Sequence, residues 1–125
     1  AAAHHLTLQG DAFDLLGELR DARRRYDLIV VDPPAFARRE SEAAGALQAY
    51  ARLTGLALGV LDEGGLLVQA SCSSRISADA FFDTVHRAAR RAGRPLREIE
   101  RTGHGVDHPI RFPEGAYLKC LYAIA

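Results

Sequence analysis

Methionine and tryptophan are both absent from this chain of 125 residues, and no apolar run approaches the length of a membrane-spanning helix. Because not even the first residue is methionine, we expect the chain to be cut from something longer. No cleavable signal segment is visible, so no membrane association is expected. The sixteen basic and sixteen acidic residues give a formal net charge of zero. This balance argues against an electrostatic attraction of polyanions to the whole surface, but it does not exclude a local basic face.

Cysteine is scarce. Cys72 and Cys120 lie far apart and lack the spacing of metal ligands, so we expect no metal site and a cytoplasmic protein with reduced thiols. A glycine-rich fingerprint for nucleotide phosphates is also missing. No repeat or linker divides the sequence, so residues 1–125 are expected to form one domain or part of one.

The most informative segment is the apolar run at residues 28–31, which is followed by Asp32, Pro33, Pro34 and Phe36. Four consecutive apolar residues, two of them β-branched, predict a strand buried on both faces of a parallel sheet. The two prolines end the strand because neither can donate a ladder hydrogen bond. The carboxyl edge of such a sheet is where ligands bind in open α/β folds.

The remaining pattern alternates between strands and helices. Asp11 and Ser77 are predicted N-caps of two helices, and a longer helix is expected at about residues 41–61, stopped by Gly64 and Gly65. Further strands are expected at residues 6–9, 66–70, 96–101 and 116–124. The order β-α-β-α-β-α-β-β predicts an α/β fold with a hairpin-like end.

Several motifs follow one another in a defined order along this pattern. They are Gly10-Asp11-Ala12-Phe13, Asp32-Pro33-Pro34-Ala35-Phe36, Glu63-Gly64-Gly65-Leu66-Leu67, Ser71-Cys72-Ser73, Asp107-His108-Pro109 and Tyr117-Leu118-Lys119-Cys120-Leu121. Together they resemble class I S-adenosylmethionine-dependent methyltransferases, and the closing motifs are similar to those of the RlmI-like ribosomal large-subunit RNA (cytosine-5)-methyltransferases. The resemblance spans residues 9–124.

This resemblance implies the C-terminal half of a Rossmann-like methyltransferase sheet, with mostly parallel strands and a terminal antiparallel hairpin. Residues 1–125 would form a partial catalytic domain, since the family's glycine-rich cofactor loop, the acidic residue that holds the ribose and the upstream RNA-binding domains have no counterpart here. The strand at residues 28–31 would then lose its neighbour. We expect this edge to pair with another chain, a second copy or a rearranged N-terminal segment, because an unpaired apolar edge favours association.

Cys72 is the candidate catalytic nucleophile that the resemblance implies, adding to C6 of cytosine so that C5 becomes electron-rich. Its place between a strand and a helix suits this role, because a nearby helix N-terminus stabilises a thiolate. The alternative is a small buried thiol without a catalytic role. Cys120 alternates with Leu118, Tyr122 and Ile124, which predicts packing in the core.

Asp32 is the second candidate catalytic residue. At the strand end its carboxyl group could hydrogen-bond or protonate the cytosine ring as negative charge builds, or it could cap a turn. Pro33 and Pro34 add rigidity and a backbone carbonyl directed into the pocket, Pro33 on the cofactor side and Pro34 on the substrate side. Phe36 either stacks on a flipped base or serves as a hydrophobic plug.

The resemblance places Asp11 and Ala12, together with Asp32 and Pro33, at the S-adenosylmethionine site. Asp11 would accept a hydrogen bond from the adenine amino group, and helix capping is its alternative or additional role. His108 resembles a family position at the substrate rim, although a loop-fixing hydrogen bond accounts for it equally well.

These residues predict an enzyme fragment that belongs to an S-adenosylmethionine-dependent methyltransferase forming 5-methylcytosine in ribosomal RNA. Two alternatives stay open. One is a methyltransferase that acts on another atom or substrate with Cys72 incidental, and the other is a non-catalytic interaction or dimerisation module. We expect the fragment alone to bind the cofactor weakly or not at all.

Overall fold

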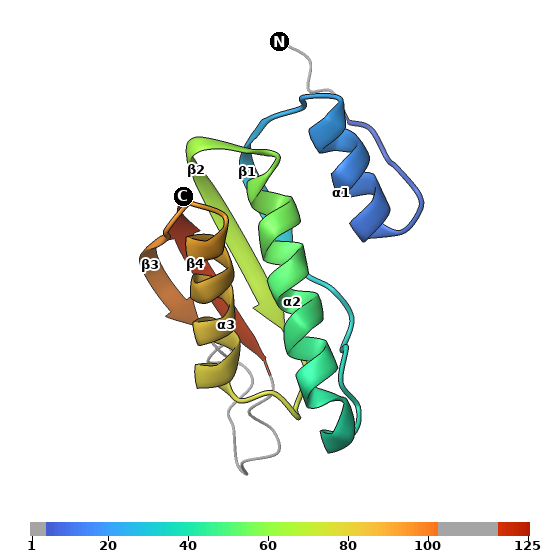
Figure 1. Cartoon of the computed structure of the whole chain (residues 1–125), viewed down its shortest axis with the longest axis vertical. Helices are drawn as coiled ribbons and strands as arrows, with labels where there is room; N and C mark the ends of the chain where they lie inside the picture. The colour runs from blue at the N-terminus through green and yellow to red at the C-terminus, as the bar shows by residue number, and fades with distance from the viewer. Residues whose placement is uncertain (1–4, 103–117) are drawn as a thin grey trace.

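The computed structural model describes residues 5–102 and 118–125. Along the chain the elements are α1 (Ala12–Asp21), β1 (Tyr26–Val31), η1 (Glu40–Glu42), α2 (Ala43–Leu58), β2 (Leu61–Ser71), α3 (Ala78–Arg91), β3 (Arg97–Thr102) and β4 (Lys119–Ile124). Figure 1 shows α2 and α3 side by side over one face of a twisted sheet, with α1 next to α2.

The sheet has four strands in the order β1-β2-β4-β3. β1 pairs with β2 in parallel, whereas β4 is antiparallel to both β2 and β3. Three strands therefore share one direction, and β4 inserts between β2 and β3. This arrangement confirms the predicted α/β class and the antiparallel end, and it brings the carboxyl ends of β1 and β2 to the same edge.

One face of the sheet is covered by helices. Tyr50 of α2 and Phe81 of α3 are fully buried there with Leu121 of β4, and a second cluster contains Leu58, Leu61, Leu67 and Ala89. The packing follows from the amphipathic patterns of α2 and α3, whose apolar residues recur at three- and four-residue steps.

The predicted caps are also confirmed, because the side chains of Asp11 and Ser77 accept backbone N–H bonds at the starts of α1 and α3.

Two predicted elements need correction. Residues 6–9 do not form a strand, and Leu6 and Leu8 are exposed, because no strand of the described residues lies beside them. The long helix ends at Leu58 with Gly59 as its cap residue, ahead of Gly64 and Gly65.

Gly64 and Gly65 instead belong to β2. Between the pairs Tyr26–Leu61 and Leu28–Leu66 the register shifts, so residues 62–65 loop out of the ladder. Gly64 has φ +80°, and a Cβ on Gly65 would lie 2.8 Å from the Asp62 carbonyl oxygen. Both positions therefore require glycine because of the loop, not because a helix ends there.

β1 differs from the strand buried on both faces that its sequence predicted. Ile29 and Val31 pack against the helix-covered core, whereas Leu28 is 54% exposed and Val30 is 62% exposed. The reason is its place at the edge of the sheet and the lack of a second covering layer among the described residues. The predicted unpaired edge of this segment is thus present.

No helix in the described part of the chain has the length and apolar character to cross a membrane.

Candidate functional site

A cavity of about 520 Å³ lies between the start of α1 and the end of β1. Its lining includes all six described residues predicted for cofactor or substrate at these two motifs: Asp11, Ala12, Asp32, Pro33, Pro34 and Phe36. Its volume falls in the range of ordinary small-molecule sites. The structure therefore joins two motifs that are about twenty residues apart in sequence. His108 lies outside the described residues.

Asp11 caps α1 through a single oxygen. Its Oδ1 accepts the backbone N–H of Phe13 at 2.8 Å and that of Asp14 at 3.3 Å. The helix-capping role is therefore observed. Among the described residues Oδ2 has no hydrogen-bond partner, which leaves one acceptor of this exposed carboxylate for a ligand in the cavity.

Asp32 and Cys72 follow two adjacent parallel strands. Val31 of β1 is paired with Gln69 of β2, so Asp32, the residue after β1, is level with Ala70, and Cys72 is the residue directly after β2. Side chains alternate along a strand, and Asp32, Ala70 and Cys72 therefore share the sheet face that α2 and α3 do not cover. Asp32 is exposed and Cys72 is half-buried, so both are accessible from the same edge.

The turn that carries Cys72 is held by a hydroxyl network beneath it. Ser71 Oγ donates to the Tyr50 hydroxyl at 2.8 Å, and the Tyr50 hydroxyl lies 3.0 Å from Ser73 Oγ. In the second of these hydrogen bonds either hydroxyl can be the donor. All three side chains are fully buried. Hydrogen bonds therefore hold both neighbours of Cys72 against α2, while Cys72 itself faces the uncovered side of the sheet.

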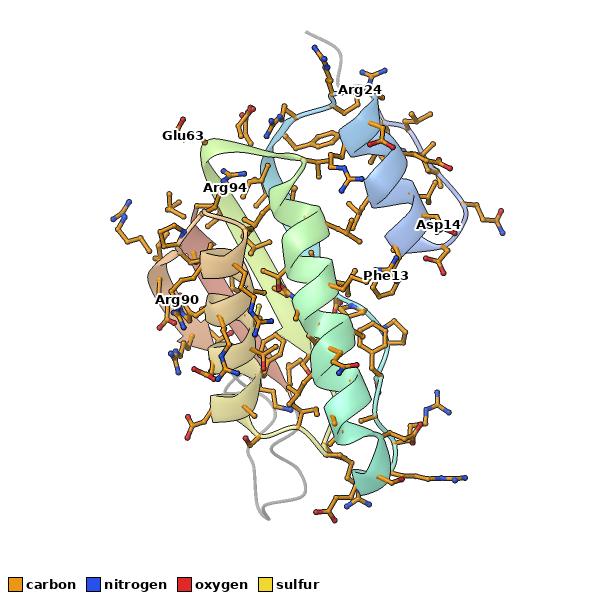
Figure 2. The ribbon with its side chains drawn as sticks, in the orientation of Figure 1. Phe13, Asp14, Arg24, Glu63, Arg90 and Arg94 are labelled. Carbon is orange, nitrogen blue, oxygen red and sulfur yellow. The ribbon has the colours of Figure 1, made fainter. Side chains whose placement is uncertain are left out.

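The same network reaches the loop after β1. Ser73 Oγ accepts the backbone N–H of Ala37 at 3.5 Å, which links the turn after β2 to the segment that follows Pro33 and Pro34. Phe36 packs in this segment, with its ring centroid 5.0 Å from that of Tyr50 and 6.3 Å from that of Phe13. Figure 2 shows Phe13 projecting from the first turn of α1 toward α2. These contacts hold the segment after β1 and the turn after β2 in place relative to each other.

Lys119 is the buried cation of the site. It is 3% exposed, and its Nζ donates to the Ser73 carbonyl oxygen at 2.5 Å. Burial lowers the pKa of Lys119, and the negative charge of the Cys72 thiolate raises it. A lysine ammonium therefore lies under the same turn that presents Cys72.

Cys120 does not have the core position predicted for it. It is half-buried on the uncovered sheet face, whereas the alternate β4 residues Lys119, Leu121 and Ala123 are the buried ones. Burial raises the pKa of the Cys120 thiol, and the Asp32 carboxylate adds to this effect. The strand register places the two residues on either side of Ala70, which is level with Asp32 and paired with Cys120. Both cysteines are free thiols.

Sequence reasoning missed Tyr50, Ser71, Ser73 and Lys119 as parts of the site. Tyr50 and Thr54 did carry a signal, because they are polar members of an otherwise apolar helical stripe. Thr54 Oγ1 donates to Gln69 Oε1 at 2.9 Å, so both residues connect α2 to β2. Among the described residues, no group of three or more His, Cys, Asp or Glu side chains could hold a metal ion.

Comparisons with known proteins agree with this architecture. The chain is 42% identical over 121 residues to a ribosomal RNA large subunit methyltransferase of Deinococcus radiodurans, and 43% identical over 122 residues to ribosomal RNA large subunit methyltransferase I of Shewanella amazonensis. These matches cover 97% and 95% of this chain. The predicted resemblance is confirmed. The chain spans 30% and 31% of the length of these two relatives.

Solved structures show the same fold. SMU.776, assigned as a methyltransferase and solved with SAH, matches 93% of this chain and 30% of its own, with a TM-score of 0.77 and 21% identity. The M1.HpyAVI–SAM complex covers 92% of this chain and 50% of its own at a TM-score of 0.54 and 18% identity. The α/β methyltransferase fold is therefore shown. No protein-family model matches the sequence.

Proposed function

We propose that residues 1–125 form the C-terminal part of the catalytic domain of an S-adenosylmethionine-dependent ribosomal RNA methyltransferase, which forms 5-methylcytosine through a covalent adduct on Cys72. The relatives named for ribosomal RNA methylation support the reaction class and the RNA substrate. The observation that carries the finer proposal is the shared sheet edge of Asp32 and Cys72. Ribosomal RNA as substrate would place the enzyme in the cytoplasm.

The cavity fits the adenosine part of the cofactor. The free Oδ2 of Asp11 would accept the adenine amino group, and Ala12 and Pro33 would supply the apolar walls. When bound, S-adenosylmethionine supplies an electrophilic methyl group on its sulfonium. The side of the cavity formed by Asp32 and Pro34 would then face the substrate base, with Phe36 stacking on it.

The proposed reaction begins when the Cys72 thiolate forms a bond to C6 of cytosine. As electrons move onto the ring nitrogen, Asp32 in its protonated form donates a hydrogen bond to that nitrogen, and C5 becomes nucleophilic. C5 would then accept the methyl group that S-adenosylmethionine, held by Asp11, Ala12 and Pro33, supplies from its sulfonium when bound. Loss of the C5 proton to a base restores the C5–C6 double bond and expels Cys72 as a thiolate, so the enzyme is unchanged.

The adduct can be trapped in the full-length enzyme with RNA that contains 5-fluorocytosine, because fluorine at C5 cannot leave as a proton. We expect a stable protein–RNA complex with the crosslink on Cys72. Cys120→Ala is the matched control and should still form the complex, whereas Cys72→Ala should not. A Cys72→Ala enzyme that methylates C5 at the normal rate would refute the role of Cys72.

A second part of the proposal concerns protein partners. The free edge of β1, with Leu28 and Val30 exposed, supports self-association of the isolated chain or pairing with another segment. Unpaired strand edges with apolar side chains are templates for such pairing.

A further inference from the structure

Two arginines lie on the segments that follow β1 and β2, at the sheet edge of Asp32 and Cys72. Arg38 is six residues after Asp32, and Arg75 is three residues after Cys72. Both arginines are exposed. Positive charge in this place matters because an RNA strand that delivers a base to this edge also brings the phosphates that flank the base.

The two segments that carry these arginines are held together on their buried side. Ser73 Oγ accepts the backbone N–H of Ala37 at 3.5 Å, which joins the residue before Arg38 to the turn that leads to Arg75. Ala37 and Ile76 are both buried in the same hydrophobic cluster. Figure 1 shows α2 and α3 beginning at the same end of the molecule, where these segments lead. Each arginine is thus next to a residue of one shared core.

Neither arginine has an ion pair among the described residues. The ion pairs present there involve other cations, such as Arg87, which pairs with Asp83 on α3. An arginine stays protonated near neutral pH. Arg38 and Arg75 therefore each present a full positive charge that no carboxylate at ion-pair distance neutralises.

The carboxylates on the same segments have other surroundings. Glu40 and Glu42 belong to η1, directly after Arg39, and Glu42 Oε1 accepts the backbone N–H of Arg39 at 3.0 Å. Asp79 lies in the first turn of α3, where the helix dipole favours an acid. These acids offset the charge of Arg39, so the other two arginines are the candidates for an anionic partner.

The cavity between α1 and β1 is not that partner's site. Among the described residues its lining includes neither Arg38 nor Arg75 and no other arginine. The two charges lie beyond the cavity, on the segments that lead into α2 and α3. Their position therefore favours a long, exposed anion over a small molecule enclosed in the cavity.

We propose that Arg38 and Arg75 bind phosphates of the RNA strand that flank the nucleotide delivered to Asp32 and Cys72. A guanidinium binds phosphate oxygens through two parallel hydrogen bonds. Such contacts fix the position of the strand without reading its sequence. This inference rests on the proposed function for its RNA substrate, but it does not depend on Cys72 being the nucleophile.

The test measures the affinity of the full-length enzyme for an unmodified transcript of large-subunit ribosomal RNA at several salt concentrations. Each phosphate contact contributes about 0.7–0.9 to the slope of log affinity against log salt concentration. Arg38→Gln and Arg75→Gln should each make this slope shallower by about that amount, and the double variant by about twice as much. An unchanged slope in the double variant would overturn the proposal.

Arg24→Gln is the matched control. Arg24 is also exposed and has no ion pair among the described residues, but it precedes β1, whereas Arg38 follows it. Figure 2 shows Arg24 at the end of the molecule opposite to the starts of α2 and α3. The salt slope of this variant should equal that of the native enzyme. An equal loss of slope in Arg24→Gln would show that any surface arginine has this effect.

Steady-state kinetics supply a second readout. Arg38→Gln and Arg75→Gln should raise the KM for RNA more than they lower kcat, and the KM for S-adenosylmethionine should not change. Because both side chains are exposed, the midpoint of thermal unfolding should stay the same. A weaker affinity for S-adenosylmethionine with an unchanged salt slope would assign the arginines to the cofactor's carboxylate and would overturn the proposal.

These readouts separate the two proposals. If 5-fluorocytosine RNA forms no adduct on Cys72 but the salt slope depends on Arg38 and Arg75, the phosphate contacts stand and the catalytic role of Cys72 fails. If the adduct forms and the slope does not depend on the two arginines, the proposed function stands and this inference fails.

Discussion

The Tyr50 hydroxyl lies 2.8 Å from Ser71 Oγ in the buried layer between α2 and β2. Together with the contact to Ser73 Oγ, this hydrogen bond ties both neighbours of Cys72 to a helix. The residues beside a reactive group are commonly held in this way, since a small displacement of the group is costly in rate. The network thus connects the stability of the fold to the geometry of the site.

Tyr50→Phe should therefore destabilise the protein by about 1–3 kcal/mol, because the buried Ser71 and Ser73 hydroxyls lose a partner without gaining water. Urea denaturation measures the effect. Tyr122→Phe is the control, since the half-buried Tyr122 lies on the uncovered sheet face, and it should change stability by less than about 0.5 kcal/mol. Equal effects of the two substitutions would contradict the assigned role of the network.

Two substitutions of Asp11 separate its role as a helix cap from its proposed role in binding S-adenosylmethionine. Asp11→Asn keeps a good N-cap, whereas Asp11→Ala should cost about 1 kcal/mol of stability. In the full-length enzyme, Asp11→Asn should weaken S-adenosylmethionine binding about tenfold, because an amide group replaces the acceptor aimed at the adenine amine. Calorimetry and thermal unfolding measure the two effects. Unchanged cofactor affinity in Asp11→Asn would limit Asp11 to capping.

Glu98 predicts a pH-dependent contribution to stability. Its carboxylate accepts from Arg101 Nε at 2.8 Å and lies 2.8 Å from His86 Nε2, and these contacts, that of Arg101 first, lower its pKa. Because the folded-state pKa is lowered, the stabilisation is complete above the ordinary glutamate pKa of 4.5 and is lost as the pH falls through the lower folded-state pKa.

Glu98→Gln should thus be less stable than the native chain by about 0.2–1 kcal/mol at pH 7, with the difference vanishing in acid. Denaturant titrations at several pH values measure this difference. Glu100→Gln on the same strand is the control, because Glu100 has no ion pair among the described residues, and its effect should not depend on pH in this way. A stability difference between the native chain and Glu98→Gln that grew as the pH fell would contradict this prediction.

Local patterns were sufficient for much of the fold. Helical periodicity and polar residues at the right offsets located α3 and the caps Asp11 and Ser77, because capping depends on a few neighbouring residues. The shared edge of Asp32 and Cys72 followed from one rule, that neighbouring parallel strands end on the same side of a sheet. Both predictions needed only short stretches of chain.

The errors concern information that sequence neighbours do not carry. Residues 28–31 are as apolar as a fully covered strand, and which of their faces is covered depends on layers contributed by distant segments. The same holds for β4, where the inner face belongs to Lys119 and Leu121, since burial of a lysine contradicts its usual preference. The Tyr50–Ser71–Ser73 network joins residues more than twenty positions apart and has no local signature.

The two edges of the sheet offer a final prediction about association. β3 carries charged residues at four of its six positions, a composition that discourages pairing with another edge, whereas β1 presents Leu28 and Val30. If the β1 edge drives association of the 125-residue chain, Val30→Lys should shift it toward the monomer in sedimentation velocity experiments. Ile99→Lys, which changes a residue of similar exposure (59% against 62%) on the β3 edge, should leave the distribution unchanged. A native chain that stays monomeric at high concentration would show that the β1 edge is tolerated without a partner. Equal effects of Val30→Lys and Ile99→Lys would show that association depends on overall charge rather than on β1.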